Sequence, residues 1–145
     1  MVRLSVILLV DRRGHLLLME RDEHAPIAPE QWGMVGGHVE DGEDFEPAAY
    51  RELEEETGIA LPPGELELWC AEVFDYARSP GGGSYHVYTA GVSLDDSDIV
   101  VGEGRQIVFV DPRSLPAMDL AESAAWFVPR FLESDTYRRI VEGAA

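Results

Sequence analysis

The chain has 145 residues, 46% hydrophobic and 27% charged, which predicts a single folded domain over residues 1–145 and argues against disorder. Twenty-eight acidic residues outnumber 11 basic ones, for a formal charge of -17, so we expect no binding to nucleic-acid polymers and no membrane association. The single cysteine excludes an internal disulfide framework and a cysteine-based zinc site, and it fits a cytoplasmic location.

The first part of the chain consists of strand-length apolar runs. Residues 4–10 and 15–19 are two such runs, and the turn residues 11–14 between them predict a hairpin. Residues 21–31 contain two prolines and are expected to be irregular. Residues 32–40 mix strand formers with closely spaced glycines, which favours a short strand, a kink and a second short strand.

Residues 44–57 carry the clearest helical signal. Asp44 suits an N-cap, Pro47 is tolerated in the first turn, and Gly58 favours a stop. The apolar positions repeat every four residues and form one narrow stripe toward the core: Ala49, Leu53 and Thr57.

The second part of the chain predicts further strands and a C-terminal helix. Residues 66–77 and 85–92 favour two strands joined by a long, glycine-rich hairpin, and residues 107–110 favour another strand. Residues 119–122 resemble a capping box that opens a helix, which Pro129 is expected to kink or split. We also expect Asp135 to cap a last short helix. This order predicts a mixed α/β domain with a helix on each side of a sheet.

Three carboxylates are expected on one face of the predicted helix. At 100° per residue, Glu56 and Glu55 lie about 40° and 60° to either side of Glu52. Like charges at these spacings destabilise a helix by about 0.2–0.5 kcal/mol per pair. A hard divalent cation would offset the repulsion, since carboxylate oxygens are its preferred ligands. The alternative is a solvated, glutamate-rich surface.

The spacing of residues before and along this helix resembles the Nudix hydrolase signature, G-x5-E-x7-R-E-U-x-E-E-x-G-U, where U is apolar. Every fixed and apolar position matches: Gly37, Glu43, Arg51, Glu52, Leu53, Glu55, Glu56, Gly58 and Ile59.

The resemblance implies an α/β fold, a Nudix-like αβα sandwich whose mixed sheet is flanked by the signature helix and a C-terminal helix. It also implies Mg²⁺- or Mn²⁺-dependent hydrolysis of a phosphoanhydride bond in a nucleoside diphosphate linked to another moiety, most simply an NTP or a modified NTP. By the same resemblance the metal ligands are Glu52, Glu55, Glu56 and the Gly36 carbonyl.

The signature also implies roles for its other polar residues. Arg51 and Glu43 are similar to a pair that orients the ligand carboxylates, although a purely structural ion pair is the alternative. Val35 stands where the family usually has proline, which leaves the kink before the glycines less fixed and could change substrate positioning.

The catalytic base is expected outside the signature. Glu103 is our candidate, because it precedes a strand as the family's loop glutamate commonly does. Glu55 or Glu56 is the alternative.

The substrate itself is predicted more coarsely. Arg21 is a candidate phosphate contact, and a surface arginine beside Asp22 and Glu23 is the alternative. Tyr76 lies at a spacing similar to one in dinucleoside polyphosphate hydrolases. A nucleotide-sugar hydrolase, a non-catalytic nucleotide sensor and an acidic protein-interaction module are alternatives, and a homodimer is left open.

Overall fold

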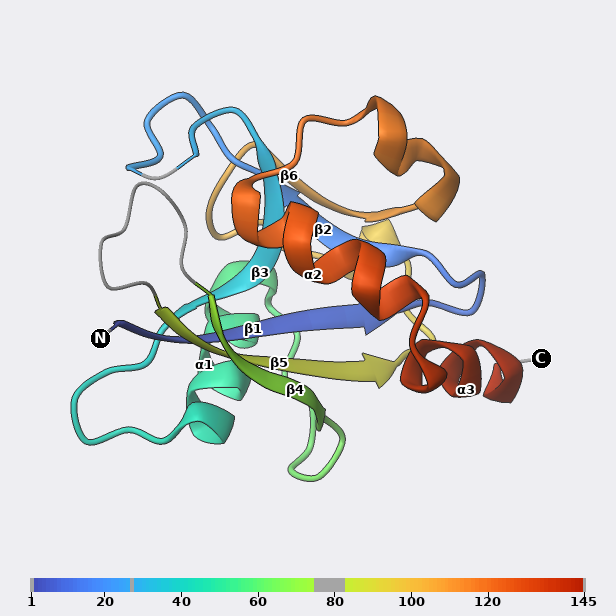
Figure 1. Cartoon of the computed structure of the whole chain (residues 1–145), viewed down its shortest axis with the longest axis horizontal. Coiled ribbons are helices and arrows are strands. Elements are labelled where there is room, and N and C mark those ends of the chain that lie inside the picture. Colours follow the sequence, from blue (N-terminus) through green and yellow to red (C-terminus); the bar gives the residue numbers. More distant parts are fainter. Residues whose placement is uncertain (1, 27, 75–82, 145) are drawn as a thin grey trace.

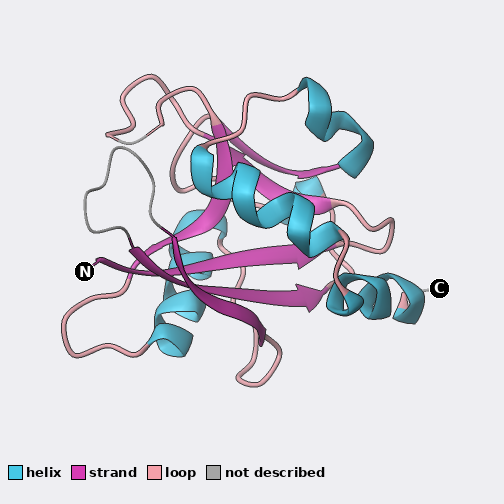
Figure 2. Cartoon of the chain, viewed as in Figure 1, coloured by secondary structure: helices cyan, strands magenta, loops and turns pink. Residues whose placement is uncertain are grey.

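The computed structural model describes residues 2–26, 28–74 and 83–144. Within these ranges six strands form one mixed sheet in the order β4-β5-β1-β3-β2-β6 (Figure 2). The parallel pair is β1 with β5, and the other neighbours are antiparallel. The strands are β1 (Val2–Val10), β2 (Leu16–Glu20), β3 (Trp32–His38), β4 (Glu67–Phe74), β5 (Gly83–Gly91) and β6 (Gln106–Val110).

Helices cover both faces of the sheet. In Figure 1, α2 (Glu122–Leu132) crosses in front of the sheet and α1 (Phe45–Thr57) lies behind it. A last helix, α3 (Asp135–Gly143), follows α2, and two 3-10 turns, η1 (Asp96–Asp98) and η2 (Pro112–Ala117), flank β6. The predicted αβα sandwich with a mixed sheet is confirmed. Among the described residues, no helix is long and apolar enough to cross a membrane.

The uninterrupted apolar run in β1 explains this layering. Val6, Leu8 and Val10 pack into the cluster under α2, whereas Ile7 and Leu9 pack into the cluster under α1. Adjacent side chains on a strand point to opposite faces, so an uninterrupted apolar run requires cover on both sides. Each such side chain contributes about 1.5–3 kcal/mol when it is fully buried.

The predicted hairpin of the first two strands forms, but its strands pair only beside the turn. β1 and β2 meet only at Val10 and Leu16, next to their turn. Beyond it β3 lies between them, pairing Val35 with Ile7 and Met34 with Leu18. The third strand can satisfy the hydrogen-bonding groups of both neighbours, which turn signals alone do not reveal.

The predicted break in β3 is wrong, since residues 32–38 form one strand. The disturbance is confined to Gly36, whose φ is +140°.

The helix ends agree with the sequence only in part. Gly58 ends α1 as predicted, with a φ of +76° and an N–H that donates to the Glu54 carbonyl at 2.8 Å. Asp44 occupies the N-cap position of α1, but its side chain makes no capping hydrogen bond.

The predicted capping box at residues 119–122 is absent, because Ala121 is the N-cap of α2. Asp119 instead accepts a hydrogen bond from Gln31 Nε2 at 2.9 Å, which ties this segment to the start of β3. Pro129 does not split α2, which continues to Leu132. Ser134 rather than Asp135 caps α3, accepting from the Tyr137 N–H at 3.1 Å.

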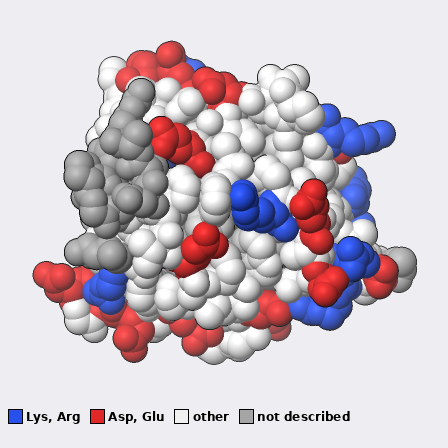
Figure 3. All heavy atoms as spheres, in the orientation of Figure 1, with Lys and Arg blue, Asp and Glu red and all other residues white. Residues whose placement is uncertain are grey.

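Charge is distributed unevenly over the surface. In Figure 3, acidic side chains surround much of the visible face, while most basic ones lie toward its right-hand edge.

Candidate active site

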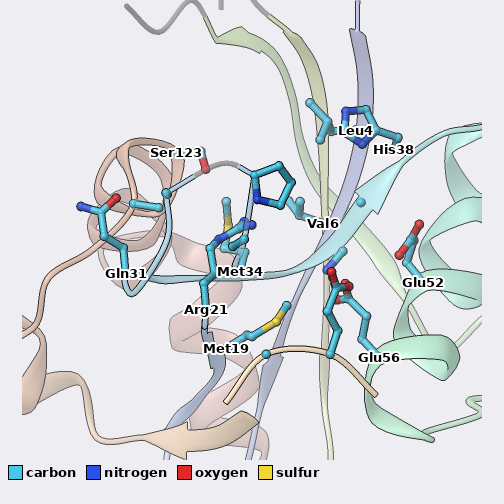
Figure 4. Close-up of a pocket in the computed structure, with 18 of the residues that line it drawn as sticks. Leu4, Val6, Met19, Arg21, Gln31, Met34, His38, Glu52, Glu56 and Ser123 are labelled. Atoms are coloured by element: carbon cyan, nitrogen blue, oxygen red, sulfur yellow. The ribbon is translucent and has the colours of Figure 1, made fainter. Parts of the chain in front are cut away.

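A cavity of about 630 Å³ opens between β3, α1, the start of α2 and the loops that follow β2 and precede β6. Five of the residues predicted from sequence line it: Arg21, Gly36, Glu52, Glu56 and Glu103. Figure 4 shows Glu52 and Glu56 projecting from α1 at one end, Arg21 in the middle, and Gln31 and Ser123 at the far end. Tyr76 lies outside the described residues.

Glu56 is the most buried of the acidic side chains in the cavity. Its residue is 5% exposed, and its Oε1 accepts a hydrogen bond from the Gly36 N–H at 2.9 Å. Burial, followed by the charges of Glu52 and Glu103, raises the pKa of Glu56 to about 8. A group in this state gives up its proton readily when positive charge arrives.

Glu52 lies directly against the backbone of β3. A Cβ at Gly37 would lie 2.8 Å from the Glu52 carboxylate, so the carboxylate occupies the space that a side chain there would fill. Burial raises the pKa of Glu52, while its hydrogen bond from Arg51 at 3.0 Å acts in the opposite direction. Gly37, the first glycine of the signature, therefore serves the placement of this carboxylate.

Gly36 is required by its surroundings. A Cβ there would lie 2.3 Å from the Ser5 carbonyl oxygen, and its φ of +140° is rarely adopted by other residues. Val35, which replaces the family's usual proline, is fully buried in the cluster under α1. The packing of Val35 and the hydrogen bond from the Gly36 N–H to Glu56 thus hold the backbone here without a proline ring, and the missing Cβ permits the close approach to Ser5.

Arg51 and Glu43 form a two-pronged ion pair beside the cavity. The Arg51 Nε and Nη2 donate to Glu43 Oε2 and Oε1 at 2.8 and 2.9 Å. This hydrogen bonding lowers the pKa of Glu43 to about 2 and raises that of Arg51. Neither residue lines the cavity. The geometry supports an orienting role, because the same guanidinium also donates to Glu52 and Glu55.

Glu55 is placed differently from Glu52 and Glu56. Its side chain is 59% exposed, does not line the cavity, and meets Arg51 Nη1 at 3.2 Å. Its roles as a metal ligand and catalytic residue stay predictions.

Glu103 reaches the cavity because its loop docks on the end of α1. The N–H groups of Val100 and Gly102 donate to the Thr57 and Glu56 carbonyls at 2.9 and 2.8 Å. A Cβ at Gly102 would lie 2.2 Å from the Glu55 carbonyl oxygen, so only glycine permits this approach. The exposed Glu103 side chain consequently lies within hydrogen-bonding reach of Glu56.

Arg21 lines the cavity with its guanidinium group. Its Nε is buried and, among the described residues, has no hydrogen-bond partner. The guanidinium passes over Gly33, where a Cβ would lie 3.1 Å from Nε. An unpartnered, buried guanidinium donor is costly, and an anionic ligand would satisfy it.

The comparisons with known proteins fit this geometry. A family model described as NUDIX domain matches residues 1–133. The chain belongs to the Nudix family. The nucleoside triphosphatase NudI of Salmonella agona is 30% identical over 118 residues, covering 77% of this chain and 84% of that protein. The dihydroneopterin triphosphate diphosphatase of Escherichia coli is 31% identical over 131 residues, covering 84% of this chain and 79% of its own. This Nudix protein is accordingly a hydrolase that acts on acid anhydrides.

A solved structure shares the fold and carries ligands. It is a bifunctional NMN adenylyltransferase/ADP ribose pyrophosphatase from Francisella tularensis, complexed with AMP and a Mn ion. Its TM-score is 0.72 at 25% identity, and the match covers 91% of this chain but 41% of that one.

The carboxylates of this Nudix site suit a divalent cation in their chemistry. Glu52 and Glu103 oppose ionisation of Glu56, and Glu55 and Glu103 oppose ionisation of Glu52. Positive charge would offset this repulsion, and hard cations prefer oxygen ligands. In the described ranges, no three His, Cys, Asp or Glu side chains are already grouped so as to hold a metal ion. The carboxylate oxygens therefore suit a divalent cation chemically, and a bound ion would have to draw these side chains closer together.

Sequence reasoning missed the far wall of the cavity. Ala121, Glu122 and Ser123 line it from the start of α2. The Trp32 N–H donates to the Asp119 carbonyl, and the Ala121 N–H donates to the Trp32 carbonyl, both at 2.8 Å. Pairing of Trp32 with the distant segment 119–121 brings this wall to the site, and no pattern of neighbouring residues in the sequence predicts such a contact.

Proposed function

We propose that this protein hydrolyses a phosphoanhydride bond in a nucleoside diphosphate derivative with Mg²⁺ or Mn²⁺, and that an NTP or modified NTP is its substrate. One observation carries the proposal: the carboxylates of Glu52, Glu56 and Glu103 share a cavity with Arg21, whose Nε has no hydrogen-bond partner within residues 2–26, 28–74 and 83–144. Such a cavity offers carboxylate oxygens to ligate a cation at one end, and next to them a guanidinium group that can bind an anion.

The charge balance supports a cation-dependent reaction. The protein carries -17 formal charges, and a polyphosphate is also strongly anionic. A bound divalent cation supplies Lewis-acid stabilisation of the charge that develops on the phosphate oxygens. Glu52 and Glu56 would hold it, with Glu55 and the Gly36 carbonyl as further predicted ligands.

The protein's own residues would then position substrate and proton. Arg21 binds a phosphate oxygen, and Arg51 keeps Glu52 in place through its hydrogen bond at 3.0 Å. Glu103 takes a proton from water as the water oxygen bonds to phosphorus and the bridging P–O bond breaks. For a nucleoside triphosphate cut between the α and β phosphates, pyrophosphate leaves and a nucleoside monophosphate remains.

The names of the relatives support a nucleotide-like substrate, and they differ in the group that carries the phosphates. NudI is named for nucleoside triphosphates, and the Escherichia coli relative for dihydroneopterin triphosphate. The Francisella neighbour is named for ADP ribose. Dinucleoside polyphosphates and nucleotide sugars remain the alternatives, as does a non-catalytic sensor. The cytoplasmic location and the absence of polymer and membrane partners stay predictions.

The test is a substrate panel read by release of phosphate, pyrophosphate and nucleoside monophosphate. It contains the eight common NTPs and dNTPs, dihydroneopterin triphosphate, ADP-ribose, a sugar nucleotide and diadenosine tetraphosphate. We expect turnover of a triphosphate with Mg²⁺ or Mn²⁺, none after exhaustive chelation with EDTA, and recovery when Mg²⁺ is returned. Binding without turnover would favour the sensor, and undiminished turnover in EDTA would refute the metal-dependent reaction.

A further inference from the structure

One wall of the cavity is a loop that follows β2 and that the Arg21 N–H closes at its base by donating to the Gln31 carbonyl at 2.9 Å. This cavity-wall loop (residues 22–26 and 28–31) contributes Asp22, Ala25, Pro26 and Ala28 to the lining. Its internal backbone-to-backbone hydrogen bonds are long: 3.4 and 3.2 Å to the Asp22 carbonyl and 3.3 Å to the Ala28 carbonyl. A shorter one, from the His24 N–H to Asp22 Oδ1 at 2.9 Å, stays within the first limb of the loop.

The backbone of the cavity-wall loop is also strained. Ala28 and Glu30 have φ values of +51° and +64°, in the left-handed region that residues with a Cβ avoid. Such conformations persist where surrounding contacts enforce them. Contacts from outside the loop must therefore contribute to its shape.

Arg105 supplies such contacts. Its Nη2 donates to Glu23 Oε2 at 2.9 Å and to Glu30 Oε1 at 3.0 Å, so one nitrogen ties both limbs of the cavity-wall loop. Its Nη1 lies 4.0 Å from Glu20 Oε2 at the end of β2. Arg105 itself does not line the cavity.

The position of Arg105 in the chain links this loop to the catalytic side of the cavity. It lies two residues after Glu103, and its backbone N–H donates to the Glu20 carbonyl at 2.9 Å. Gly104, with a φ of +82°, packs against the Glu20 carbonyl and Met19 at the same point. The backbone that carries Glu103 is thus anchored independently of the Arg105 side chain.

We infer that Arg105 is a positioning residue that holds the cavity-wall loop in its substrate-binding shape. The inference rests on the proposed function, since it concerns the affinity of the same cavity. A wall contacts the bound substrate equally in the ground and transition states, so its loss raises KM and leaves kcat nearly unchanged. Exposed ion pairs are individually weak, and losing two of them predicts a KM increase of about three- to tenfold.

The experiment compares R105Q with R113Q, a matched control. Arg113 also loses an ion pair, to Asp111 at 2.7 Å, but its side chain is 91% exposed and lies outside the cavity lining. KM and kcat are measured on the best triphosphate of the panel with saturating Mg²⁺. We expect the KM increase in R105Q, kcat within threefold of wild type, recovery in R105K, and no change in R113Q.

A second pair of measurements separates positioning from general stability. The double variant E23Q/E30Q removes the same ion pairs from the loop side. It also tests the inference if R105Q fails to fold. It should raise KM as R105Q does and add little in the R105Q background. Equal KM values in R105Q and R113Q, or a fall in kcat alone, would overturn the inference.

Hydrogen exchange of the substrate-free protein keeps this inference separate from the proposed function. Amides of the cavity-wall loop should exchange faster in R105Q or E23Q/E30Q than in R113Q. A wild type inactive on every substrate would refute the proposed function alone. Equal exchange in all variants would refute the role of Arg105, whatever the activity.

Discussion

Removing the charge of Glu56 should stabilise the metal-free protein in a pH-dependent way. The pKa of Glu56 is raised from 4.5 to about 8, so the metal-free fold prefers its protonated form. The unfolded chain ionises near pH 4.5. The stabilisation from the bound proton is therefore complete below about pH 4.5 and is lost as the pH rises to about 8.

The size of the effect follows from the same shift. At about 1.4 kcal/mol per pKa unit, the wild type loses on the order of 3 to 5 kcal/mol between pH 4.5 and pH 8. Gln at position 56 keeps an oxygen to accept the Gly36 N–H, now at 2.9 Å, and carries no charge. For a chain of this length, E56Q should thus melt roughly 10 °C above wild type at pH 8 and close to it at pH 4.5.

Thermal unfolding in EDTA, followed by circular dichroism from pH 4.5 to 9, measures this difference. E54Q is the matched control, because Glu54 is an exposed acid on the same helix. Mg²⁺ should reverse the order at pH 8, since the cation favours the ionised wild-type carboxylate. A gap between E56Q and wild type that does not change with pH, or one that E54Q reproduces, would contradict the reasoning.

Three further substitutions test the remaining site residues. E103Q should lower kcat by about 10²- to 10⁴-fold while Mg²⁺ affinity, measured by calorimetry, changes far less; a near-normal kcat would reassign the base. G37A should weaken Mg²⁺ binding and lower kcat at least about tenfold, because the added Cβ displaces the Glu52 carboxylate. G143A is the control: open space surrounds a Cβ at that position, so Mg²⁺ binding and kcat should not change. R21Q should raise KM about 10- to 100-fold through loss of a charge-assisted hydrogen bond, and an unchanged KM would exclude Arg21 as a phosphate contact.

The local chemistry of the signature could be predicted from the sequence. The spacing of Glu52 and Glu56 places both on one helix face, and the glycine after Thr57 ends the helix. The order of strands and helices along the chain predicted a helix on each side of a sheet, and the apolar clusters on the two faces of β1 agree with it. These features depend on neighbours within a few residues along the chain, so a pattern in the sequence is sufficient to show them.

Which carboxylates enter the cavity was decided by tertiary contacts. A helical wheel places Glu55 and Glu56 at similar angles from Glu52, yet Glu56 is 5% exposed and the Glu55 side chain 59%. The difference arises because β3 offers its Gly36 N–H to Glu56, whereas Arg51 holds Glu55 at the surface.

The remaining features of the site come from segments far apart in the sequence. Glu103 reaches Glu56 because Gly102 docks on the end of α1. Arg21, whose Nε has no hydrogen-bond partner in the described part of the chain, lies in a cavity whose far wall is the start of α2. The insertion of β3 between β1 and β2 brings these parts together. Sequence periodicity reports which face of an element is buried, and it carries no information on which other element covers that face. The signature helix could therefore be predicted from the sequence, whereas the cavity beside it is formed only when the sheet packs distant segments together.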